Sequence, residues 1–338
     1  MVQSMFDGKD ILITGGTGSF GRILTDILLS RYKPNRIIIY SRDELKQLLM
    51  AESFNSAQRL SLRFFIGDVR DSRRLRRAMN GIDYVIHAAA LKHVPVAEYN
   101  PMECVKTNVL GASNVIEEAI DAGVKSVIAL STDKATHPVN LYGASKLASD
   151  KLFVAANNVV GKQMTRFSVV RYGNVLGSRG SVITLYKKLI KEGRSNLPLT
   201  DSRMTRFWIT LEQGARFVLK CFERMYGGET FIPRIPSMKM VDIVNAMAPN
   251  SEPQIIGIRP GEKLHEVMCP ADVCYRVLAY PEYFVIKPSI RYTDVDNDYT
   301  VSRLGEKGEP VAEGFEYSSA TNTDWLSKEA FLKLIENI

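Results

Sequence analysis

Residues 10–21 read D-I-L-I-T-G-G-T-G-S-F-G and predict a buried strand that runs straight into a glycine-rich turn. An amphipathic run at residues 22–30 follows, so the turn should open into a helix. Gly15, Gly18 and Gly21 permit a tight turn and a close backbone approach, while the helix N-terminus offers N–H groups to a pyrophosphate. The alternative is a plain surface turn. The order strand, turn, helix favours a dinucleotide site.

The end of the next predicted strand, residues 36–40, bears on which dinucleotide is bound. An acidic residue at this place commonly holds the ribose 2′-hydroxyl of NAD, whereas a basic residue accommodates the 2′-phosphate of NADP. Ser41 and Arg42 come first here and favour NADP. Asp43 follows directly and leaves NAD open.

Strands and helices continue to alternate, with strands expected at residues 63–66 and 83–90 and a helix at 71–79. This order implies an α/β fold with a parallel sheet covered by helices on both faces. Asp68 is placed to meet an adenine edge. The small residues 88–90 suit either a flat ring against the strand end or tight packing of a helix on the sheet.

The second half of the chain departs from this pattern. A long helix should begin at Pro101 and run to about residue 122, and one more strand is expected at 167–171. Shorter elements follow, so we expect two domains, residues 1–171 and 172–338. An apolar stripe in residues 326–338 should dock the C-terminal helix on the body.

Residues 131–146, S-T-D-K-A-T-H-P-V-N-L-Y-G-A-S-K, carry the candidate chemistry. Tyr142 and Lys146 are four residues apart and share one face of a predicted helix, so the ammonium can lower the pKa of the phenol. A phenolate can take a proton from an alcohol. Such a pair also arises by chance. The neighbouring Asp133 and Lys134 add an acid and an amine that alcohol oxidation alone does not require, which indicates a further proton-transfer step. The alternative is that they form only a surface ion pair.

Composition excludes several classes of protein. The 338 residues are 45% hydrophobic and 24% charged, as in a soluble globular protein, and the net charge of +7 suits anionic small molecules better than nucleic acid. No leader pattern and no apolar run of about 18 residues is present, so we expect no membrane partner and a cytoplasmic protein. Four cysteines and four histidines lack metal-ligand spacing, which argues against a metal site.

The glycine turn, the Ala-Ala-Ala strand end, Thr107-Asn108 and the Tyr-x-x-x-Lys pair resemble, in this order, the extended short-chain dehydrogenase/reductases, which have a Rossmann sheet. More narrowly, the chain resembles the inverting UDP-N-acetylglucosamine 4,6-dehydratases of bacterial pseudaminic acid synthesis. The segments that carry this resemblance are residues 11–21, 41–47, 65–71, 87–95, 131–135, 140–146, 171–182, 203–210 and 257–266. One departure is Thr184-Leu185, where that family more often has a proline.

Related families differ at single positions. Sugar-nucleotide 4-epimerases place a simple Ser or Thr where Asp133-Lys134 stands, and dTDP-glucose 4,6-dehydratases have Asp-Glu there. Two alternatives stay open: a UDP-sugar 4-epimerase of the same fold, which would lose no water, and a non-catalytic NADP-sensing protein, which would need neither Tyr142 nor Lys146.

The resemblance implies a catalytic cycle in which the cofactor returns its hydride to the sugar, so that NADP is regenerated and no net oxidation occurs. Tyr142 takes the C4 hydroxyl proton while hydride passes to the nicotinamide, and Thr132 hydrogen-bonds the C4 oxygen. Lys134 then acts as base at C5 and Asp133 as acid to the departing C6 hydroxyl. Hydride returns to C6, and C5 is protonated from the opposite face. Because Lys134 must be neutral for this, we expect desolvation and nearby cations to lower its pKa.

The resemblance also implies the binding residues and a homo-oligomer, a dimer or a hexamer. The expected substrate-binding residues are Lys92, Thr132, Asn174, Val182, Arg206, Arg259 and Glu262. The expected cofactor-binding residues are Gly15, Thr17, Gly18, Ser19, Phe20, Gly21, Ser41, Arg42, Asp43, Lys46, Asp68, Val69, Ala88, Ala89, Lys92, Thr107, Tyr142 and Lys146.

Overall fold

Short apolar segments rich in β-branched residues form a ten-stranded central sheet in this computed structural model. The structure describes residues 4–161, 164–178, 180–194, 196–290 and 297–336. Seven neighbouring strands are parallel, and the order reverses between β1 and β4, as in a doubly wound sheet. The predicted α/β Rossmann sheet is thus confirmed. In spatial order these strands are β3 (Leu62–Ile66), β2 (Arg36–Ser41), β1 (Asp10–Thr14), β4 (Tyr84–His87), β5 (Ser126–Thr132), β6 (Arg166–Tyr172) and β10 (Thr230–Pro233).

The sheet continues beyond β10 with antiparallel strands from late in the chain. These are β15 (Tyr283–Ile286), β14 (Val277–Ala279) and β16 (Glu309–Pro310), in that spatial order. The sheet therefore crosses the position at which we expected one domain to end. A division of the chain near residue 171 stays a prediction.

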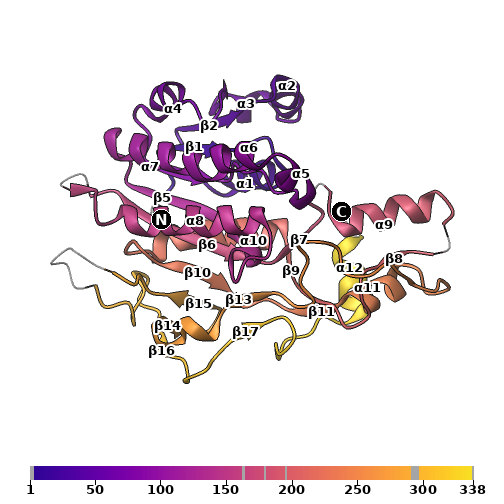
Figure 1. The fold of residues 1–338 in the computed structure, drawn as a ribbon. Coiled ribbons are helices and arrows are strands. Elements are labelled where there is room, and N and C mark those ends of the chain that lie inside the picture. The colour runs from indigo at the N-terminus through magenta and orange to yellow at the C-terminus, as the bar shows by residue number, and fades with distance from the viewer. Residues whose placement is uncertain (1–3, 162–163, 179, 195, 291–296, 337–338) are drawn as a thin grey trace.

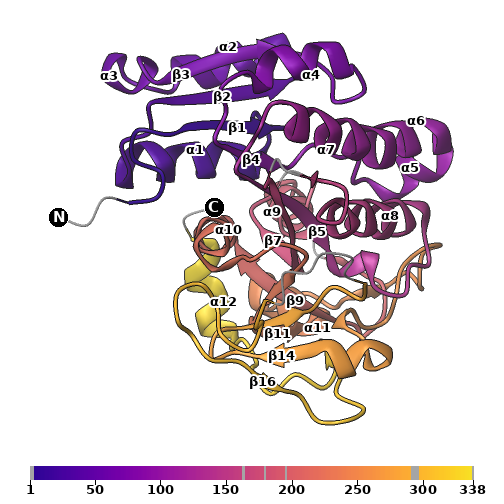
Figure 2. The same cartoon turned by 90° about the vertical axis from the view of Figure 1, so that its left-hand side faces the viewer.

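Helices cover both faces of the sheet because successive side chains of a strand point in opposite directions. Ile11 and Ile13 of β1 pack in a core with α1 and α10, whereas Leu12 packs in a second core with α4, α7 and α8. Figure 2 shows α1 on one side of the sheet and α7 and α8 on the other. These helices are α1 (Ser19–Arg31), α4 (Ser72–Met79), α7 (Gly111–Asp121), α8 (Leu141–Ala156) and α10 (Leu211–Arg224).

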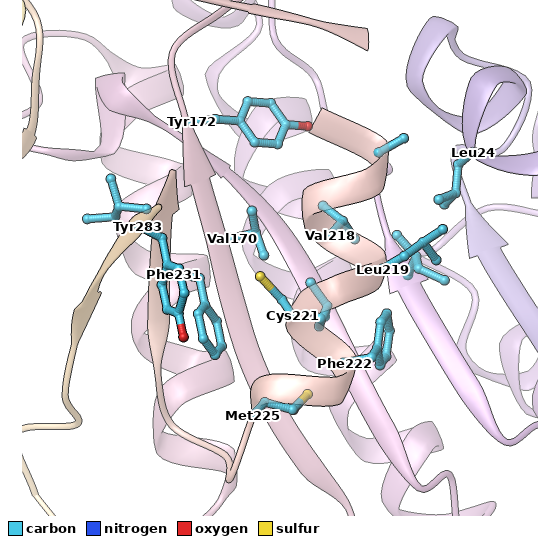
Figure 3. Packing of buried hydrophobic residues seen from close by; sticks show 14 of the residues in the cluster. Leu24, Val170, Tyr172, Val218, Leu219, Cys221, Phe222, Met225, Phe231 and Tyr283 are labelled. Carbon is cyan, nitrogen blue, oxygen red and sulfur yellow. The ribbon is translucent and has the colours of Figure 1, made fainter. Parts of the chain in front are cut away.

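Helix α10 connects the late part of the chain to the first core. Its Val218 and Phe222 are fully buried and lie between β6, β10 and α1 (Figure 3). Phe222 packs edge-on against Phe6 and Tyr84, with ring centroids 5.8 and 5.5 Å away. Burying aromatic rings of this size contributes a large share of core stability, so α10 belongs to the body of the sheet.

A smaller lobe lies beside the carboxyl ends of the strands (Figure 1). Its core holds Trp208, Tyr186 and Phe331, so the C-terminal helix docks there as its apolar stripe predicted. The lobe consists of β7 (Asn174–Leu176), β9 (Thr205–Thr210), β11 (Ser237–Lys239), α9 (Val182–Lys191), α11 (Met240–Met247), α12 (Lys328–Ile335) and the pair β8 (Pro198–Leu199) and β12 (Gln254–Ile255). Residues 337–338 of the predicted stripe lie outside the described part of the chain.

Two predicted elements differ from those observed. Strand β4 ends at His87, and residues 88–90 form the chain's exit from the sheet. The long helix starts at Pro101 as predicted, but it contains a π-helical turn. Shorter helices, turns and a strand pair connect these elements: α2 (Glu44–Glu52), α3 (Ser56–Arg59), α5 (Val94–Tyr99), α6 (Pro101–Val105), the π-turn η1 (Lys106–Leu110), the 3-10 turns η2 (Asp133–Ala135) and η4 (Ala271–Arg276), and the pair β13 (Val267–Cys269) and β17 (Tyr317–Ser318).

Candidate active site

A cleft of about 1090 Å³ runs along the carboxyl ends of the parallel strands and reaches the lobe. This volume exceeds that of a typical single-ligand pocket, so two ligands can lie end to end in it. Every residue expected to bind cofactor or substrate lines this cleft. Of the predicted catalytic residues, Thr132, Lys134, Tyr142 and Lys146 line it as well, whereas Asp133 is fully buried behind its wall.

The glycine turn forms the floor of the cleft below α1. Gly15 has φ +67°, and a Cβ atom there would lie 2.9 Å from the backbone of Ala89. A Cβ on Gly21 would lie 2.3 Å from the carbonyl oxygen of Gly16. Among the described residues, no side chain caps the N-terminus of α1. The turn thus suits a pyrophosphate, because its backbone packs closely below a helix N-terminus whose cap residue, Gly18, has no side chain.

The end of β2 presents a hydroxyl and a guanidinium to the cleft. Gln47 donates to Ser41 Oγ at 3.0 Å and to the Phe65 carbonyl at 2.9 Å, which orients the buried Ser41. Arg42 is half exposed and lies 3.7 Å from Asp68. Asp43 caps α2 by accepting from the Lys46 backbone at 2.9 Å and also pairs with the Lys46 ammonium. Sequence reasoning assigned no role to Gln47, because an orienting contact depends on the fold.

Tyr142 and Lys146 lie one turn apart on α8, which Asn140 caps by accepting from the backbone of Gly143 at 2.8 Å. Burial raises the pKa of Tyr142 to about 12, while the charge of Lys134 and a hydrogen bond with Thr132 act in the opposite direction. The charge that lowers this pKa most is that of Lys134, whereas the prediction assigned this effect to Lys146. Burial lowers the pKa of Lys146 itself.

Strand β5 ends in a tight turn that brings three functional groups together. Thr132 Oγ1 donates to Asp133 Oδ1 at 2.9 Å, and Lys134 Nζ donates to the same oxygen at 3.1 Å. Burial alone lowers the pKa of Lys134, but the carboxylates of Asp133 and Glu266 outweigh burial and raise it above its ordinary value. The expected lowering of this pKa is wrong, because the neighbours that dominate are anions.

Glu266 is a site residue that sequence reasoning missed. It lines the cleft, is 2% exposed and lies 3.3 Å from Lys134 Nζ. It is the last residue of the segment G-I-R-P-G-E-K-L-H-E, but nothing in that pattern separates it from Glu262. Only the fold places it beside the turn after β5.

The lobe supplies the remaining candidate groups. Asn174 Oδ1 lies 3.5 Å from Lys134 Nζ, and Val182 is the first residue of α9, so its backbone N–H belongs to a helix N-terminus. Arg259 is exposed and pairs with Glu262 at the mouth. Arg206 donates to the carbonyl oxygens of residues 205, 263 and 264, so in this structure it holds the 263–266 segment. Substrate binding by these residues stays a prediction.

Within the described ranges, no group of three His, Cys, Asp or Glu side chains is arranged to hold a metal ion. Nor is any helix among those residues long and apolar enough to cross a membrane.

The glycine turn after β1 and the Tyr142–Lys146 pair on α8, set on a doubly wound sheet, define the class of extended short-chain dehydrogenase/reductases. Within that class, the chain belongs to the family described as polysaccharide biosynthesis protein, whose model matches residues 11–288.

Comparison with known proteins narrows the relationship. The chain is 61% identical to the UDP-N-acetylglucosamine 4,6-dehydratase (inverting) of Campylobacter jejuni serotype O:2, over 98% of this chain and 99% of that protein. It is 38% identical to the UDP-glucose 4-epimerase of Rickettsia massiliae, over 98% and 96% of the two chains. The crystal structure of Pen from Bacillus thuringiensis superposes with a TM-score of 0.88 at 36% identity, covering 99% of each chain. The predicted resemblance to inverting dehydratases is thus confirmed.

Proposed function

We propose that this protein is a hydro-lyase that removes water from UDP-N-acetylglucosamine across C5 and C6, with inversion at C5. The product is UDP-2-acetamido-2,6-dideoxy-β-L-arabino-hex-4-ulose, for bacterial pseudaminic acid synthesis in the cytoplasm. The observation that carries the proposal is the Asp133–Lys134 ion pair, placed beside Tyr142 at the end of β5. The 61% identical relative has the corresponding name.

The residues at the end of β2 favour NADP as the cofactor. Because Gln47 donates to Ser41 Oγ, the hydrogen of the Ser41 hydroxyl is left to donate to a phosphate oxygen. Arg42 adds a positive charge at the same place, while Asp43 is occupied by the backbone and ammonium of Lys46. An engaged carboxylate is a poor acceptor for a ribose 2′-hydroxyl, so the 2′-phosphate is favoured over the hydroxyl of NAD.

In the proposed reaction, different residues of the chain carry out the individual proton transfers. Bound NADP would accept hydride from C4 and return it to C6. Tyr142 takes the proton of the C4 hydroxyl, and Thr132 holds that oxygen. The 4-ketone that results acidifies C5–H, so Lys134 can remove this proton while Asp133 protonates the departing C6 hydroxyl. Lys134 lines the cleft and Asp133 stands directly behind it.

The observed ion pair is compatible with these roles. An ammonium beside a carboxylate and an amine beside a carboxylic acid contain the same number of protons. Transfer of one proton from Lys134 Nζ to Asp133 Oδ1, over 3.1 Å, therefore creates the base and the acid together. The raised pKa of Lys134 favours the ammonium form before this transfer.

Proton NMR of UDP-N-acetylglucosamine with the enzyme and NADP in deuterated water tests the proposal. We expect the C6 hydroxymethyl signal to be replaced by a C6 methyl signal, with deuterium at C5 and altered ring couplings. The Lys134→Ala variant should lose this conversion by at least roughly a hundredfold, the usual loss for a proton-transfer group. Full dehydration by that variant would contradict its role as the base.

A UDP-sugar 4-epimerase is the second candidate, because the Rickettsia relatives at 38% identity have epimerase names. In the same NMR experiment, a galacto-configured product without a methyl signal would favour it. An unchanged spectrum would favour another sugar nucleotide or a non-catalytic NADP-sensing protein.

We also propose that the protein is a homo-oligomer whose interface includes the helices that begin at Pro101 and Leu141, together with the neighbouring α5. Val96, Tyr99, Met102 and Leu110 expose apolar side chains there, and Tyr99 is 87% exposed. Light scattering that shows a monomer over a range of concentrations would contradict this.

A further inference from the structure

Lys134 lies between oxygens that come from distant parts of the chain. Its Nζ is 3.1 Å from Asp133 Oδ1, 3.3 Å from Glu266 Oε1 and 3.5 Å from Asn174 Oδ1. The side chains of Asp133 and Glu266 are 0% and 2% exposed, so both carboxylates act on the ammonium with little screening by water. Lys134 thus has two buried anionic partners, although the proposed chemistry uses only Asp133.

The fold holds Glu266 firmly in this place. Its backbone N–H donates to Ser319 Oγ at 2.9 Å, and the N–H of Ser319 donates back to the carbonyl of Glu266 at 2.8 Å. Strand β13 begins at the next residue and pairs with β17. Two reciprocal hydrogen bonds and a strand pairing therefore fix the direction from which the carboxylate approaches Lys134.

Glu266 is itself only partly satisfied. Arg206 Nε lies 3.8 Å and Lys263 Nζ 3.6 Å from its carboxylate, yet within the described residues no group donates a hydrogen bond to its Oε2. Arg206 and Lys263 also donate to backbone carbonyls, Lys263 to that of Thr136 at 2.6 Å. Lys134 is thus the nearest of the three cations that surround the Glu266 carboxylate.

We propose that Glu266 is a positioning residue, which anchors the Lys134 ammonium at the wall of the cleft and sets the pH at which this amine releases its proton. The Glu266 carboxylate lies 3.3 Å from Lys134 Nζ and therefore favours the ammonium form of Lys134 over the neutral amine. Lys134 becomes the neutral base only when its proton moves to Asp133. In the described part of the chain, the titratable or charged groups that face Lys134 and Glu266 are Asp133, Tyr142, Arg206 and Lys263.

Glu266→Gln tests this role, because it keeps the shape of the side chain and removes the charge. Glu262→Gln is the matched control, since Glu262 comes from the same segment and lines the cleft but pairs with Arg259. In full-length protein labelled with [ε-13C]lysine, the Lys134 signal is identified by its absence from Lys134→Arg. We expect Glu266→Gln to lower the pKa of Lys134 by about one unit or more, and Glu262→Gln to leave it unchanged.

The pH dependence of kcat gives the second readout, which rests on the proposed function. Because the proposed active form keeps one proton on the Lys134–Asp133 pair, loss of that proton sets the basic limb. Lowering the pKa of Lys134 should therefore move the basic limb of the Glu266→Gln profile to lower pH, while loss of the anchor lowers the plateau. Glu266→Asp should keep the limb near its wild-type position. Glu262→Gln should raise KM without moving the limb.

The outcomes separate the two proposals. A shifted Lys134 signal in an enzyme that loses no water would contradict the proposed function and support the role of Glu266. Dehydration by Glu266→Gln with an unmoved limb and an unshifted signal would contradict the role of Glu266 alone. A lower plateau with neither shift would mean that Glu266 only stabilises the fold.

Discussion

Arg42 and Asp43 are neighbours in the chain but have different partners. Asp43 caps α2 and pairs with Lys46, whereas Arg42 is half exposed at the rim of the cleft, 3.7 Å from Asp68. The Asp43 carboxylate already accepts two donors, so it is a poor partner for a ribose hydroxyl. The Arg42 guanidinium reaches the cleft and can bind a phosphate. This difference, rather than the order of the two residues in the sequence, supports the choice of NADP.

Arg42→Ala should weaken NADP binding by roughly tenfold or more, because it removes a charge-assisted hydrogen bond to the 2′-phosphate. NAD lacks this phosphate and is the matched control ligand, so its affinity should hardly change. Titration calorimetry with both dinucleotides measures the two effects. An equal loss of affinity for both would mean that Arg42 supports the cleft generally and does not read the phosphate.

Short motifs were sufficient to predict most of these residues but not their charge states. The Tyr142–Lys146 spacing and the Asp133–Lys134 pair can be read from the chain because the local backbone places them. The pKa of Lys134 could not be predicted from the chain, because it depends on Glu266. Glu266 is held at the site by its contact with Ser319 and by the β13–β17 pairing.

At the scale of elements, the first turn of α8 packs against the turn after β5. A Cβ atom on Gly143 would lie 2.1 Å from the carbonyl oxygen of Lys134. The position of the Asp133–Lys134 turn therefore depends on a glycine between Tyr142 and Lys146. The Tyr-x-x-x-Lys segment therefore supplies the candidate base Tyr142 and also, at Gly143, the space that the Asp133–Lys134 turn occupies.

Gly143→Ala should push this turn away from α8. We expect kcat to fall by roughly tenfold to a hundredfold, because small displacements of catalytic groups are costly, and the free energy of unfolding to fall by about 1–3 kcal/mol. Gly214→Ala in α10 is the control: its Cβ would meet no atom closer than 3.9 Å. Alanine favours helix, so that variant should be as stable as the parent or more so. Similar losses in both variants would rule out the steric explanation.

The π-helical turn in η1 shows what local patterns do not predict. Residues 101–122 have an ordinary helical pattern, yet the hydrogen bonding changes at residues 106–110. Asn108 lies in this turn and binds both backbone groups of Leu91, accepting from its N–H at 2.8 Å and donating to its carbonyl at 3.0 Å. The partner belongs to the exit from β4, so only the assembled fold shows the reason for a turn there.

At the scale of the molecule, an ion pair joins the segment before β16 to the buried Arg224 of α10. Arg224 is 1% exposed and donates to both carboxylate oxygens of Glu306 at 2.7 and 2.8 Å. Burial alone would raise the pKa of Glu306, but hydrogen bonds from Arg224 and Tyr283 lower it to about 2. Because this pKa is depressed, the stabilisation is complete above the ordinary value of 4.5 and is lost as the pH falls toward 2.

Glu306→Gln should therefore lower the free energy of unfolding at pH 7 by roughly 3 kcal/mol, since it leaves the buried Arg224 guanidinium with only the exposed carboxylate of Glu282, 3.4 Å away, as an anionic partner. The variant should also lose less stability than the parent between about pH 4.5 and 2. Urea unfolding at a series of pH values measures both effects. Glu309→Gln, an exposed neighbour in β16, should change stability by less than about 0.5 kcal/mol. A parent-like pH profile in Glu306→Gln would contradict the assignment.

The amino-acid sequence by itself determined the strand–turn–helix at residues 10–31, the parallel sheet and the placement of Tyr142 and Lys146 one turn apart on a helix, because these follow from glycine conformation and from periods of two and 3.6 residues. The tertiary structure decided how the late strands extend the sheet and which charges surround Lys134. Electrostatic energy depends on distance in space, and Glu266, which is far from Lys134 in the chain, becomes its neighbour only in the folded protein.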